Sequence, residues 1–426
     1  MSLMKLLVWQ PVYVLGGGLE VLRRMVAALG RHPSIDSITL AANRRYPNAA
    51  LAPLALGRRV RIVRVDLGTR LNAYAASHDV AYIPWPHGTP HMPAAIPKVC
   101  VFQDTIVMDA LGGHATRDFL EGMARGVREA VAYHDHMIVT SNYTRRRILA
   151  TTGGDHADRI SVLPHMATEP DPATSGHTAP LPWDIRPPYI VYPANASEHK
   201  NHETLMLALA RRRRRDVPVV LYGYGIEQIG AATLAEQAHV NRINRFIRDR
   251  GVVAGRDFKS LGYVDDPTAT ALLRSATALV MPTRAEGMGL PIHEAIDAGV
   301  PVICSDIEVL REHYDHRSRA IIWVDPECPA AIAHALDDAC DHADERRAAA
   351  TDNSGSGRTW DDLAAATVEI LRETIAGYDP AAPAVVSVPP GASLPPAAPS
   401  RFGTWRFRGL RRVCGKIAGK LGLSRA

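Results

Sequence analysis

Two glutamates separated by a glycine-rich turn are the residues of this sequence best suited to chemistry. Glu286 and Glu294 lie eight positions apart, and two glycines and a proline stand between them. The apolar run 278–282 predicts a buried strand before the turn, and the proline at a first helical turn predicts a helix over 291–299. A strand, a glycine loop and a helix in this order offer backbone N–H groups and a positive helix end to an anion. Two carboxylates beside them can accept hydroxyl protons, so the segment predicts a site for a sugar joined to a nucleoside diphosphate.

This segment resembles the signature of glycosyltransferase family 4, the large retaining family with the GT-B fold. Pro282-Thr283 before it and 298–302 after it fit the same pattern. The resemblance implies that Glu286 lies at the donor sugar and that Glu294 binds the ribose hydroxyls. It also implies that the backbone between them contacts sugar and phosphate, at Gly287, Met288, Gly289 and Leu290. The alternative is a tight strand-to-helix turn with two surface carboxylates.

A second motif lies where the second half of the chain begins. Asn195 and Lys200 follow a predicted strand at 189–193 and precede a predicted helix at 203–210. In the family an Arg and a Lys neutralise the donor diphosphate here; Lys200 matches the Lys, and Asn195 stands where the Arg is expected. A Lys–phosphate contact is a charge-assisted hydrogen bond worth about 1.5–3 kcal/mol. The resemblance therefore assigns catalysis to Lys200 with Glu286 and places Asn195 in the donor site; a solvated lysine is the alternative.

Other positions complete the donor site that the resemblance implies. Gly17 and Gly18 lie between the first strand and its helix, like the family's glycine loop beside the diphosphate. Gln103 and Asp104 end a strand where many relatives have His-Asp; a glutamine can hydrogen-bond a sugar hydroxyl but cannot carry a proton. Two turns at the ends of strands supply the remaining candidates. The first contains Gly223. The second contains Tyr263 and Val264 and resembles the turn whose backbone contacts the nucleobase in the family.

No metal ion and no cofactor besides the donor substrate are expected. The segments 134–136 and 155–158 lack further ligands at zinc spacing, and the chain contains no Asp-x-Asp motif. We interpret their histidines as surface residues, and the run 211–215 as basic residues that complement a helix C-terminus. The donor phosphates would then be met by Lys200 and by backbone dipoles.

The elements around these motifs predict an α/β protein with two doubly wound parallel sheets, because short apolar runs alternate with helical patterns in both halves. The helix 142–152, capped by Ser141, is one example. Predicted strands are 5–9, 35–41, 60–65, 80–84, 98–103, 136–140 and 160–163 in the first half and 189–193, 217–222, 277–282, 301–304 and 320–324 in the second.

The length of 426 residues fits two domains, and the GT-B resemblance implies two Rossmann-like domains that face each other across a cleft. The predicted order is an acceptor-side domain at 1–170, a linker at 171–187, a nucleotide-sugar-binding domain at 188–357, a helix at 358–378 that crosses back to the first domain, a Pro- and Ala-rich linker at 379–400, and a basic tail at 401–426.

Composition restricts the location and the partners. The sequence contains no run of eighteen apolar residues, and the apolar run 6–9 is too short for a signal peptide. Five scattered cysteines indicate a reducing cytoplasm. The net charge is +5, but 401–426 holds eight basic residues and no acidic one, so the rest of the chain is slightly acidic and predicts no nucleic-acid binding.

The tail itself has an apolar stripe at helical spacing, formed by Leu410, Val413, Ile417 and Leu421, with arginines pointing away from it. Such a helix binds anionic lipid, so we expect a peripheral anchor on a membrane surface, at the inner face of the plasma membrane. A disordered basic tail or a helix docked on another protein is the alternative.

The reaction that the resemblance implies is transfer of a hexose from a nucleoside diphosphate sugar to a hydroxyl, with retained configuration. A lipid-linked glycan of a cell-envelope polysaccharide pathway is the expected acceptor. The alternatives are a non-catalytic or degenerate nucleotide-sugar-binding protein, favoured by Gln103 and Asn195, and an epimerase or phosphorylase on the same fold. A hydrolase is a further alternative, and it would need two carboxylates that face one anomeric carbon.

Overall fold

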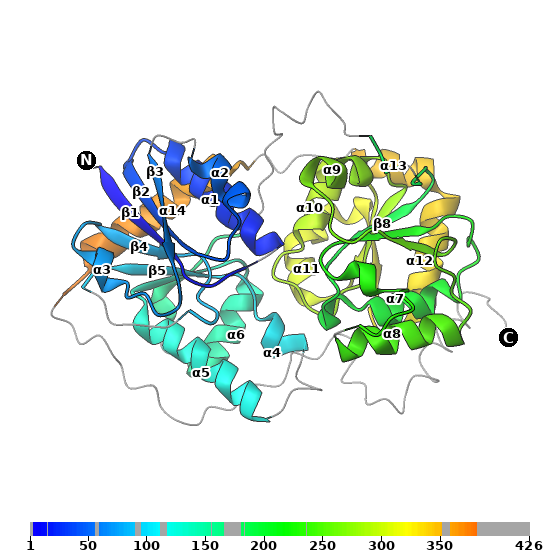
Figure 1. Ribbon diagram of the computed structural model, residues 1–426, viewed down its shortest axis with the longest axis horizontal. Coiled ribbons are helices and arrows are strands. Elements are labelled where there is room, and N and C mark those ends of the chain that lie inside the picture. Colours follow the sequence, from blue (N-terminus) through cyan, green and yellow to red (C-terminus); the bar gives the residue numbers. More distant parts are fainter. Residues whose placement is uncertain are drawn as a thin grey trace. The chain divides into compact units, whose positions relative to one another are not determined.

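The computed structural model describes two compact units, which are shown in Figure 1. Met1–Glu169 and a segment that starts at Gly357 form the first unit, and Pro170–Ser356 form the second. The tail at 401–426, most of the linker at 379–400 and most of 171–187 lie outside the described residues. The described residues are 3–380, with the exception of 15, 56–58, 90–94, 111–116, 155, 166–179, 183, 236 and 352–357.

The first unit is built on a seven-stranded sheet in the order β3-β2-β1-β4-β5-β6-β7. Neighbouring strands pair in parallel throughout. The strand order reverses between β1 and β4, so this is the switch point of the sheet. The predicted strands of this half are confirmed, as β1 (Met4–Gln10), β2 (Ile35–Asn43), β3 (Val60–Val65), β4 (Val80–Ile83), β5 (Lys98–Phe102), β6 (His136–Val139) and β7 (Ile160–Val162).

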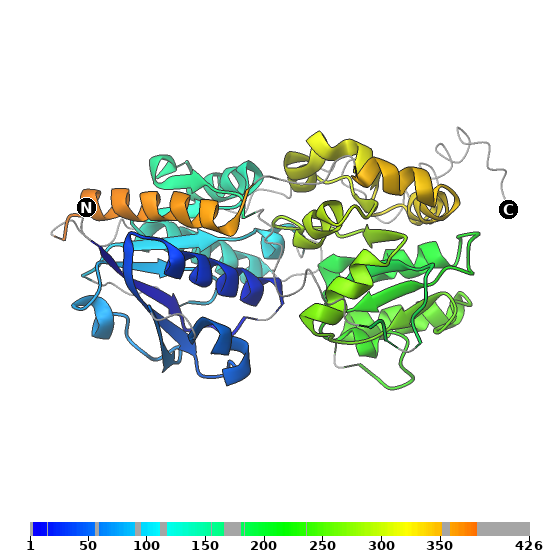
Figure 2. The ribbon, with the colours of Figure 1, turned by 90° about the horizontal axis from the view of Figure 1, so that it is seen from above.

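Helices lie on both faces of this sheet, as Figure 2 shows. The prediction for α6 (Asn142–Thr152) is confirmed, because the Ser141 side chain accepts a hydrogen bond from the Thr144 N–H at its first turn. The other helices of the unit are α1 (Gly17–Arg31), α2 (Asn48–Ala55), α3 (Asn72–Ala75), α4 (Ile106–Ala110), α5 (Arg117–Tyr133) and α14 (Trp360–Gly377).

The last of these helices, α14, belongs to the first unit although it follows the second unit in sequence. Thr359 begins it with a capping box, and it lies beside α1 (Figure 2). Arg31 of α1 forms an ion pair with Asp361 at 2.8 Å, and the Arg24 guanidinium lies over the Trp360 ring, 5.9 Å from its centre. These contacts join the C-terminal end of the described chain to its first helix.

The second unit has a six-stranded sheet in the order β10-β9-β8-β11-β12-β13, and its switch point lies between β8 and β11. All of its strand pairs are parallel. The sequence did not predict β10, which has three residues. The strands are β8 (Ile190–Pro193), β9 (Val219–Tyr222), β10 (Phe258–Ser260), β11 (Ala278–Met281), β12 (Val302–Ser305) and β13 (Ile321–Val324). The helices are α7 (His202–Leu209), α8 (Ala238–Asp249), α9 (Asp266–Arg274), α10 (Leu290–Asp297), α11 (Glu308–Tyr314), α12 (Pro329–Asp341) and α13 (Ala343–Thr351).

The prediction that the arginine run at 211–215 complements a helix end is confirmed at Arg211 only, whose guanidinium donates to the Leu207 carbonyl in the last turn of α7 at 2.8 Å. Helix α7 ends at Leu209, before the run begins. Arg214 pairs with Asp341 of α12 at 2.9 Å, and Arg215 pairs with Asp257 beside β10 at 2.5 Å. The run therefore ties three segments of the second unit together by ion pairs.

The prediction of surface histidines was also wrong at His134. This side chain is buried, and its Nδ1 lies 2.6 Å from the Ala130 carbonyl oxygen at the end of α5. His136 is half-buried and hydrogen-bonds the Ser161 hydroxyl at 2.8 Å. Within the described part of the chain, no three His, Cys, Asp or Glu side chains are grouped so that they could hold a metal ion. No described helix is long and apolar enough to cross a membrane.

Candidate functional site

The two motifs with the strongest sequence signal meet at the switch point of the second unit. The Lys200 motif follows β8 and the Glu286 turn follows β11, and these two strands are hydrogen-bonded neighbours. In an open parallel sheet, the loops at such a reversal diverge and leave room for a ligand beyond the carboxyl ends of the strands. The order of the strands thus brings together two segments that lie 86 residues apart in the sequence.

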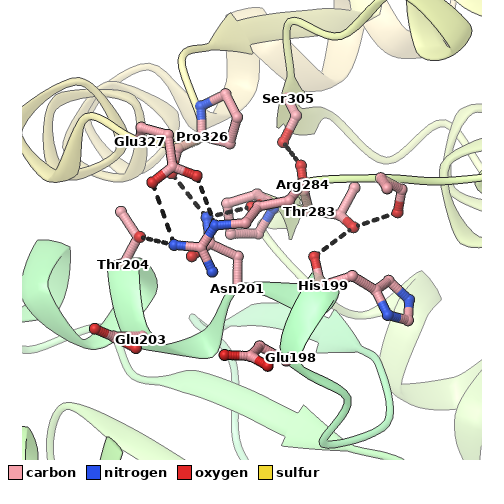
Figure 3. Close-up of polar contacts among 12 residues, drawn as sticks. Glu198, His199, Asn201, Glu203, Thr204, Thr283, Arg284, Ser305, Pro326 and Glu327 are labelled. Carbon is pink, nitrogen blue, oxygen red and sulfur yellow. Dashed lines mark hydrogen bonds and ion pairs between the residues drawn. The ribbon is translucent and has the colours of Figure 1, made fainter. Parts of the chain in front are cut away.

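Asn201 joins these two loops (Figure 3). Its side-chain amide donates to the Pro282 carbonyl at 2.9 Å and to the Pro326 carbonyl at 2.7 Å, and the residue is buried. Its backbone has φ of 59°, a left-handed conformation that asparagine tolerates better than most residues. One buried side chain therefore fixes the ends of three loops. The sequence analysis did not single out Asn201, although it follows Lys200 directly.

Further bonds lie beside Asn201 in Figure 3. The Thr283 hydroxyl and the Arg284 N–H both lie within hydrogen-bonding distance of the His199 carbonyl, at 3.0 and 2.7 Å. Ser305, at the end of β12, donates its hydroxyl to the Thr283 carbonyl at 2.6 Å. Arg284 in turn forms an ion pair with Glu327 at 2.6 Å. The loop after β11 is thus fixed by its neighbours on both sides.

Lys200 and Glu286 form an ion pair between these loops. Their side chains are 17% and 7% exposed, so most of the pair is shielded from water. The Tyr192 hydroxyl donates to the Lys200 carbonyl at 2.5 Å and supports the same loop from β8. Burial, followed by the nearby Glu286 charge, raises the pKa of Tyr192 well above its ordinary value, which keeps this hydroxyl a donor. The structure therefore joins the two residues to which the sequence assigned catalysis.

The glycine turn behind Glu286 is tightly packed. Gly289 has φ of 72°, and a Cβ there would lie 3.0 Å from Ile292 and 3.1 Å from Leu310. The Tyr314 hydroxyl of α11 donates to the Gly289 carbonyl at 3.1 Å. The turn also includes Gly287 and Met288, the latter buried, and it leads into α10, which begins at Leu290 with proline in its first turn. Close packing leaves the turn one conformation in which its N–H groups can face a ligand.

Glu294 lies on α10 and is half-buried. After burial, the Glu294 charge is the next largest cause that raises the pKa of Tyr222, so these side chains are near each other. Gly223 follows directly, and its N–H donates to the Gly262 carbonyl at 2.8 Å. A Cβ on Gly223 would lie 2.4 Å from the Ala194 carbonyl oxygen, so only glycine lets the loops after β8, β9 and β10 meet.

Asn195 and Tyr263 border this junction. Asn195 accepts a hydrogen bond from the Ser197 N–H at 3.2 Å, which turns the chain toward Lys200. Tyr263 is 72% exposed, and Val264 next to it is half-buried. Both follow the Gly262 turn, so the structure places every candidate of the second unit along one edge of its sheet.

Two histidines beside Lys200 carry no charge at neutral pH. Burial, and then the Lys200 charge, lower the pKa values of His199 and His202 to about 3. The His202 ring is buried against Tyr192, with 5.0 Å between ring centres. Without a ligand, these imidazoles therefore add no positive charge to the site.

The candidates of the first unit lie at the ends of β1 and β5. Gly17 begins α1, is exposed, and has nothing within 4 Å of where its Cβ would be; no side chain caps the first turn of this helix. Gly18 is packed, since its Cβ would lie 2.4 Å from Val14 and 3.2 Å from Trp85. Gln103 is buried and donates to the Pro84 carbonyl at 3.4 Å. Asp104 accepts from the Ile106 N–H at 3.0 Å and so begins α4.

His87 is a candidate that the sequence analysis missed. It follows β4 and lies against Phe102, with 4.1 Å between ring centres. Burial lowers its pKa to about 4, so the ring is neutral, and no described protein group hydrogen-bonds its Nε2. Its place after the strand next to β5 was the signal available in the sequence. His87, Trp85 and the glycine loop therefore surround the switch point of the first unit.

The site and the fold together define the class of this protein. Residues 177–354 match the family model described as "Glycosyl transferases group 1". The described part of the chain has the fold of solved GT-B glycosyltransferases. It covers all of Anabaena HepE, solved with UDP and glucose, at a TM-score of 0.62 and 18% identity over 87% of this chain. It covers 99% of WaaG, a glycosyltransferase involved in lipopolysaccharide biosynthesis, at a TM-score of 0.60 and 13% identity over 86% of this chain.

Two relatives represent the similarity in sequence. O-antigen chain mannosyltransferase B of Escherichia coli is 29% identical over 226 residues, which are 50% of this chain and 54% of that protein. A GDP-mannose-dependent alpha-(1-6)-phosphatidylinositol monomannoside mannosyltransferase of Mycobacterium tuberculosis is 24% identical over 319 residues, 71% of this chain and 78% of that protein. The chain thus spans about half the length of the first relative. The resemblance to GT-B glycosyltransferases of the family 4 type is confirmed, and retention of configuration is not part of that finding.

Proposed function

We propose that this protein transfers a hexose from a nucleoside diphosphate sugar to a hydroxyl acceptor, with retention of configuration. The observation that carries the proposal is the Lys200–Glu286 pair at the switch point of a group 1 glycosyltransferase domain. A cation and a carboxylate held side by side suit a ligand that has an anionic part and a hydroxyl-rich part.

The described residues suggest a role for each part of the site. Lys200 and the N–H groups of the turn before α10 would stabilise the charge that grows on the leaving diphosphate. Glu286 would orient the sugar hydroxyls, and Glu294, one turn into α10, would accept hydrogen bonds from the ribose. The N–H groups at the start of α1 and the neutral His87 are the candidates on the first unit. No side chain is assigned as a general base.

A donor screen tests this function. The full chain is incubated with GDP-mannose, UDP-glucose and other nucleotide sugars, and release of nucleoside diphosphate is measured with and without candidate glycan acceptors. GDP-mannose comes first because two similar proteins are mannosyltransferases and the name of one specifies GDP-mannose. We expect one donor to be consumed, and anomeric NMR of the product to show the configuration of the donor. Nucleotide-sugar binding without turnover, when every acceptor fails, would instead support the non-catalytic alternative.

We further propose that the reaction needs no metal ion. Lys200 and backbone dipoles would meet the phosphate charge. Activity should persist in EDTA. Full loss on chelation, with recovery on addition of manganese or magnesium, would contradict this part of the proposal.

The acceptor is proposed to be lipid-linked, with the basic tail 401–426 holding the protein at an anionic membrane surface. Because α14 runs to Gly377 and packs on α1, a chain that ends at residue 380 keeps this helix. We expect the full chain to sediment with anionic vesicles in a salt-sensitive way and the shortened chain to stay in solution. Equal behaviour of both forms would exclude the tail as an anchor.

A further inference from the structure

The Lys200–Glu286 pair is fixed by the bonds around it. Lys200 lies between His199, whose carbonyl accepts from the loop after β11, and Asn201, whose side chain donates to Pro282. The backbones that carry the two charges are thus tied to each other on both sides of Lys200. The fold therefore holds Lys200 and Glu286 close to each other, so a ligand that binds one of these side chains competes with the other.

Among the charged groups near the pair, Lys200 is the one that can bind an anion. Arg284 is engaged with Glu327 and with the Thr204 hydroxyl. His199 and His202 are neutral, as described above. Glu294 adds a second carboxylate along the same edge of the sheet. The cation that these two loops offer to a phosphate is therefore already balanced by Glu286.

A diphosphate that binds Lys200 competes with Glu286 for the ammonium group. The released carboxylate is 7% exposed, and a shielded carboxylate without donors is strongly unfavourable. A nucleoside diphosphate sugar supplies hydroxyl donors to replace the lysine, whereas a bare nucleoside diphosphate has none at that position and brings its own terminal charge.

We propose that Lys200 and Glu286 exchange partners when the donor binds, and that this exchange makes the site prefer the nucleoside diphosphate sugar over the nucleoside diphosphate. After transfer the sugar hydroxyls are gone, Glu286 regains Lys200, and the diphosphate product is expelled. Glu286 is then a specificity determinant that acts against the product. This inference rests on the proposed function. It adds a preference for the donor over the diphosphate product, which a contact between Glu286 and the sugar alone would not give.

The test is the affinity of Glu286→Gln for nucleotides. Titration calorimetry is done with GDP, UDP, GDP-mannose and UDP-glucose on the wild type and the variant. Glutamine keeps the size of the side chain but not its charge, so Lys200 is free for phosphate. We expect the variant to bind the nucleoside diphosphate about five- to tenfold more tightly and the nucleotide sugar no more tightly, with stronger product inhibition.

Three further variants control the result. Lys200→Met in the Glu286→Gln background should abolish the gain, because the gain requires the free lysine. Glu294→Gln should weaken both ligands, and Glu345→Gln, on the exposed surface of α13, should change neither. If Glu286→Gln unfolds, Glu286→Ala, which admits water to Lys200, gives the same comparison.

The outcomes separate the two claims. If the wild type binds the nucleotides but Glu286→Gln binds the nucleoside diphosphate equally or more weakly, the exchange is wrong and the proposed function stands. If the wild type binds no nucleotide and no nucleotide sugar, the proposed function falls, and the exchange falls with it.

Discussion

The switch points of the two sheets are built from different chemistry. In the second unit, the loops after β8 and β11 carry opposite charges and are joined by the amide of Asn201 and the hydroxyl of Thr283. In the first unit, the loop after β1 meets the loop after β4 by packing of Gly18 against Trp85, and His87 beside it is neutral. Fixed polar bonds suit a site that holds a charged ligand in one orientation, whereas a neutral, packed site suits a ligand that brings little charge.

Glycine substitutions should show the largest contrast between the two regions. Gly223→Ala places a Cβ 2.4 Å from a backbone oxygen at φ of 142°, so we expect a loss of about 4 kcal/mol in the free energy of unfolding. Gly17→Ala meets nothing within 4 Å and places a better helix former in the first turn of α1, so stability should stay the same or rise by less than about 1 kcal/mol. Urea denaturation measures both. Similar losses in the two variants would show that the glycine loop before α1 is as constrained as the junction at Gly223.

Removal of the amide that joins the second-unit loops should have the next largest effect. Asn201→Ala leaves the Pro282 and Pro326 carbonyls without this donor and puts alanine at φ of 59°, so we expect a loss of about 3 kcal/mol. Asn201→Gly is the matched control, because it loses the same bonds without the backbone strain and should lose less. Thermal unfolding reports both values. A loss below about 1 kcal/mol in the alanine variant would mean that the loops do not depend on Asn201.

The two carboxylates of the charged site should differ in what they control. Glu286→Ala should lower turnover about 100-fold, or about 2.7 kcal/mol, because its contact is to the reacting sugar. Glu294→Ala should mainly weaken nucleotide binding, because the ribose loses an acceptor. Steady-state kinetics and calorimetry separate the two effects. Equal and small effects of the two substitutions would mean that Glu286 and Glu294 are only part of a structural turn.

Acid should destabilise both units, over different ranges. Free histidine titrates near pH 6.5, but burial lowers the pKa to about 4 for His87 and His165 and to about 3 for His199 and His202. Below pH 6.5 the unfolded chain therefore holds protons that the folded chain lacks. The free energy of unfolding then falls by up to about 1.4 kcal/mol per pH unit for each histidine, until the folded pKa is reached.

Hydrogen exchange resolved by unit at about pH 6.5, 5, 4 and 3 measures this dependence. Replacement His202→Phe, which keeps a ring against Tyr192, should flatten the acid slope of the second unit and leave the first unit unchanged. An unchanged slope in the second unit would mean that the pKa of His202 is not lowered in the folded chain.

The smallest effect is expected at Gln103 in the first unit. Its amide donates to a backbone carbonyl, so Gln103→His should shift the relative rates with different donors by less than about tenfold, rather than abolish transfer. A donor panel with the wild type and the variant decides this. Identical rates with every donor would place Gln103 outside the sugar pocket.

Local patterns in the sequence determined most of the elements. The strand, glycine turn and helix around Glu286 and Glu294 were predicted from an apolar run, two glycines and a proline, and the structure has β11, the turn and α10 there. The Ser141 cap was predicted in the same way. These features depend on neighbours a few residues away, so their physical causes can be read along the chain.

The tertiary structure alone decided which distant residues meet. The Lys200–Glu286 pair spans 86 residues, and Asn201 reaches Pro326 across 125. Both depend on the order β10-β9-β8-β11-β12-β13, which the sequence does not state. The arginines at 212–215 and His134 were misread for the same reason, since their partners or their burial come from packed segments that periodicity does not identify. Strand order follows from how whole elements bury their apolar faces together, a property of the packed core and not of any short stretch of chain.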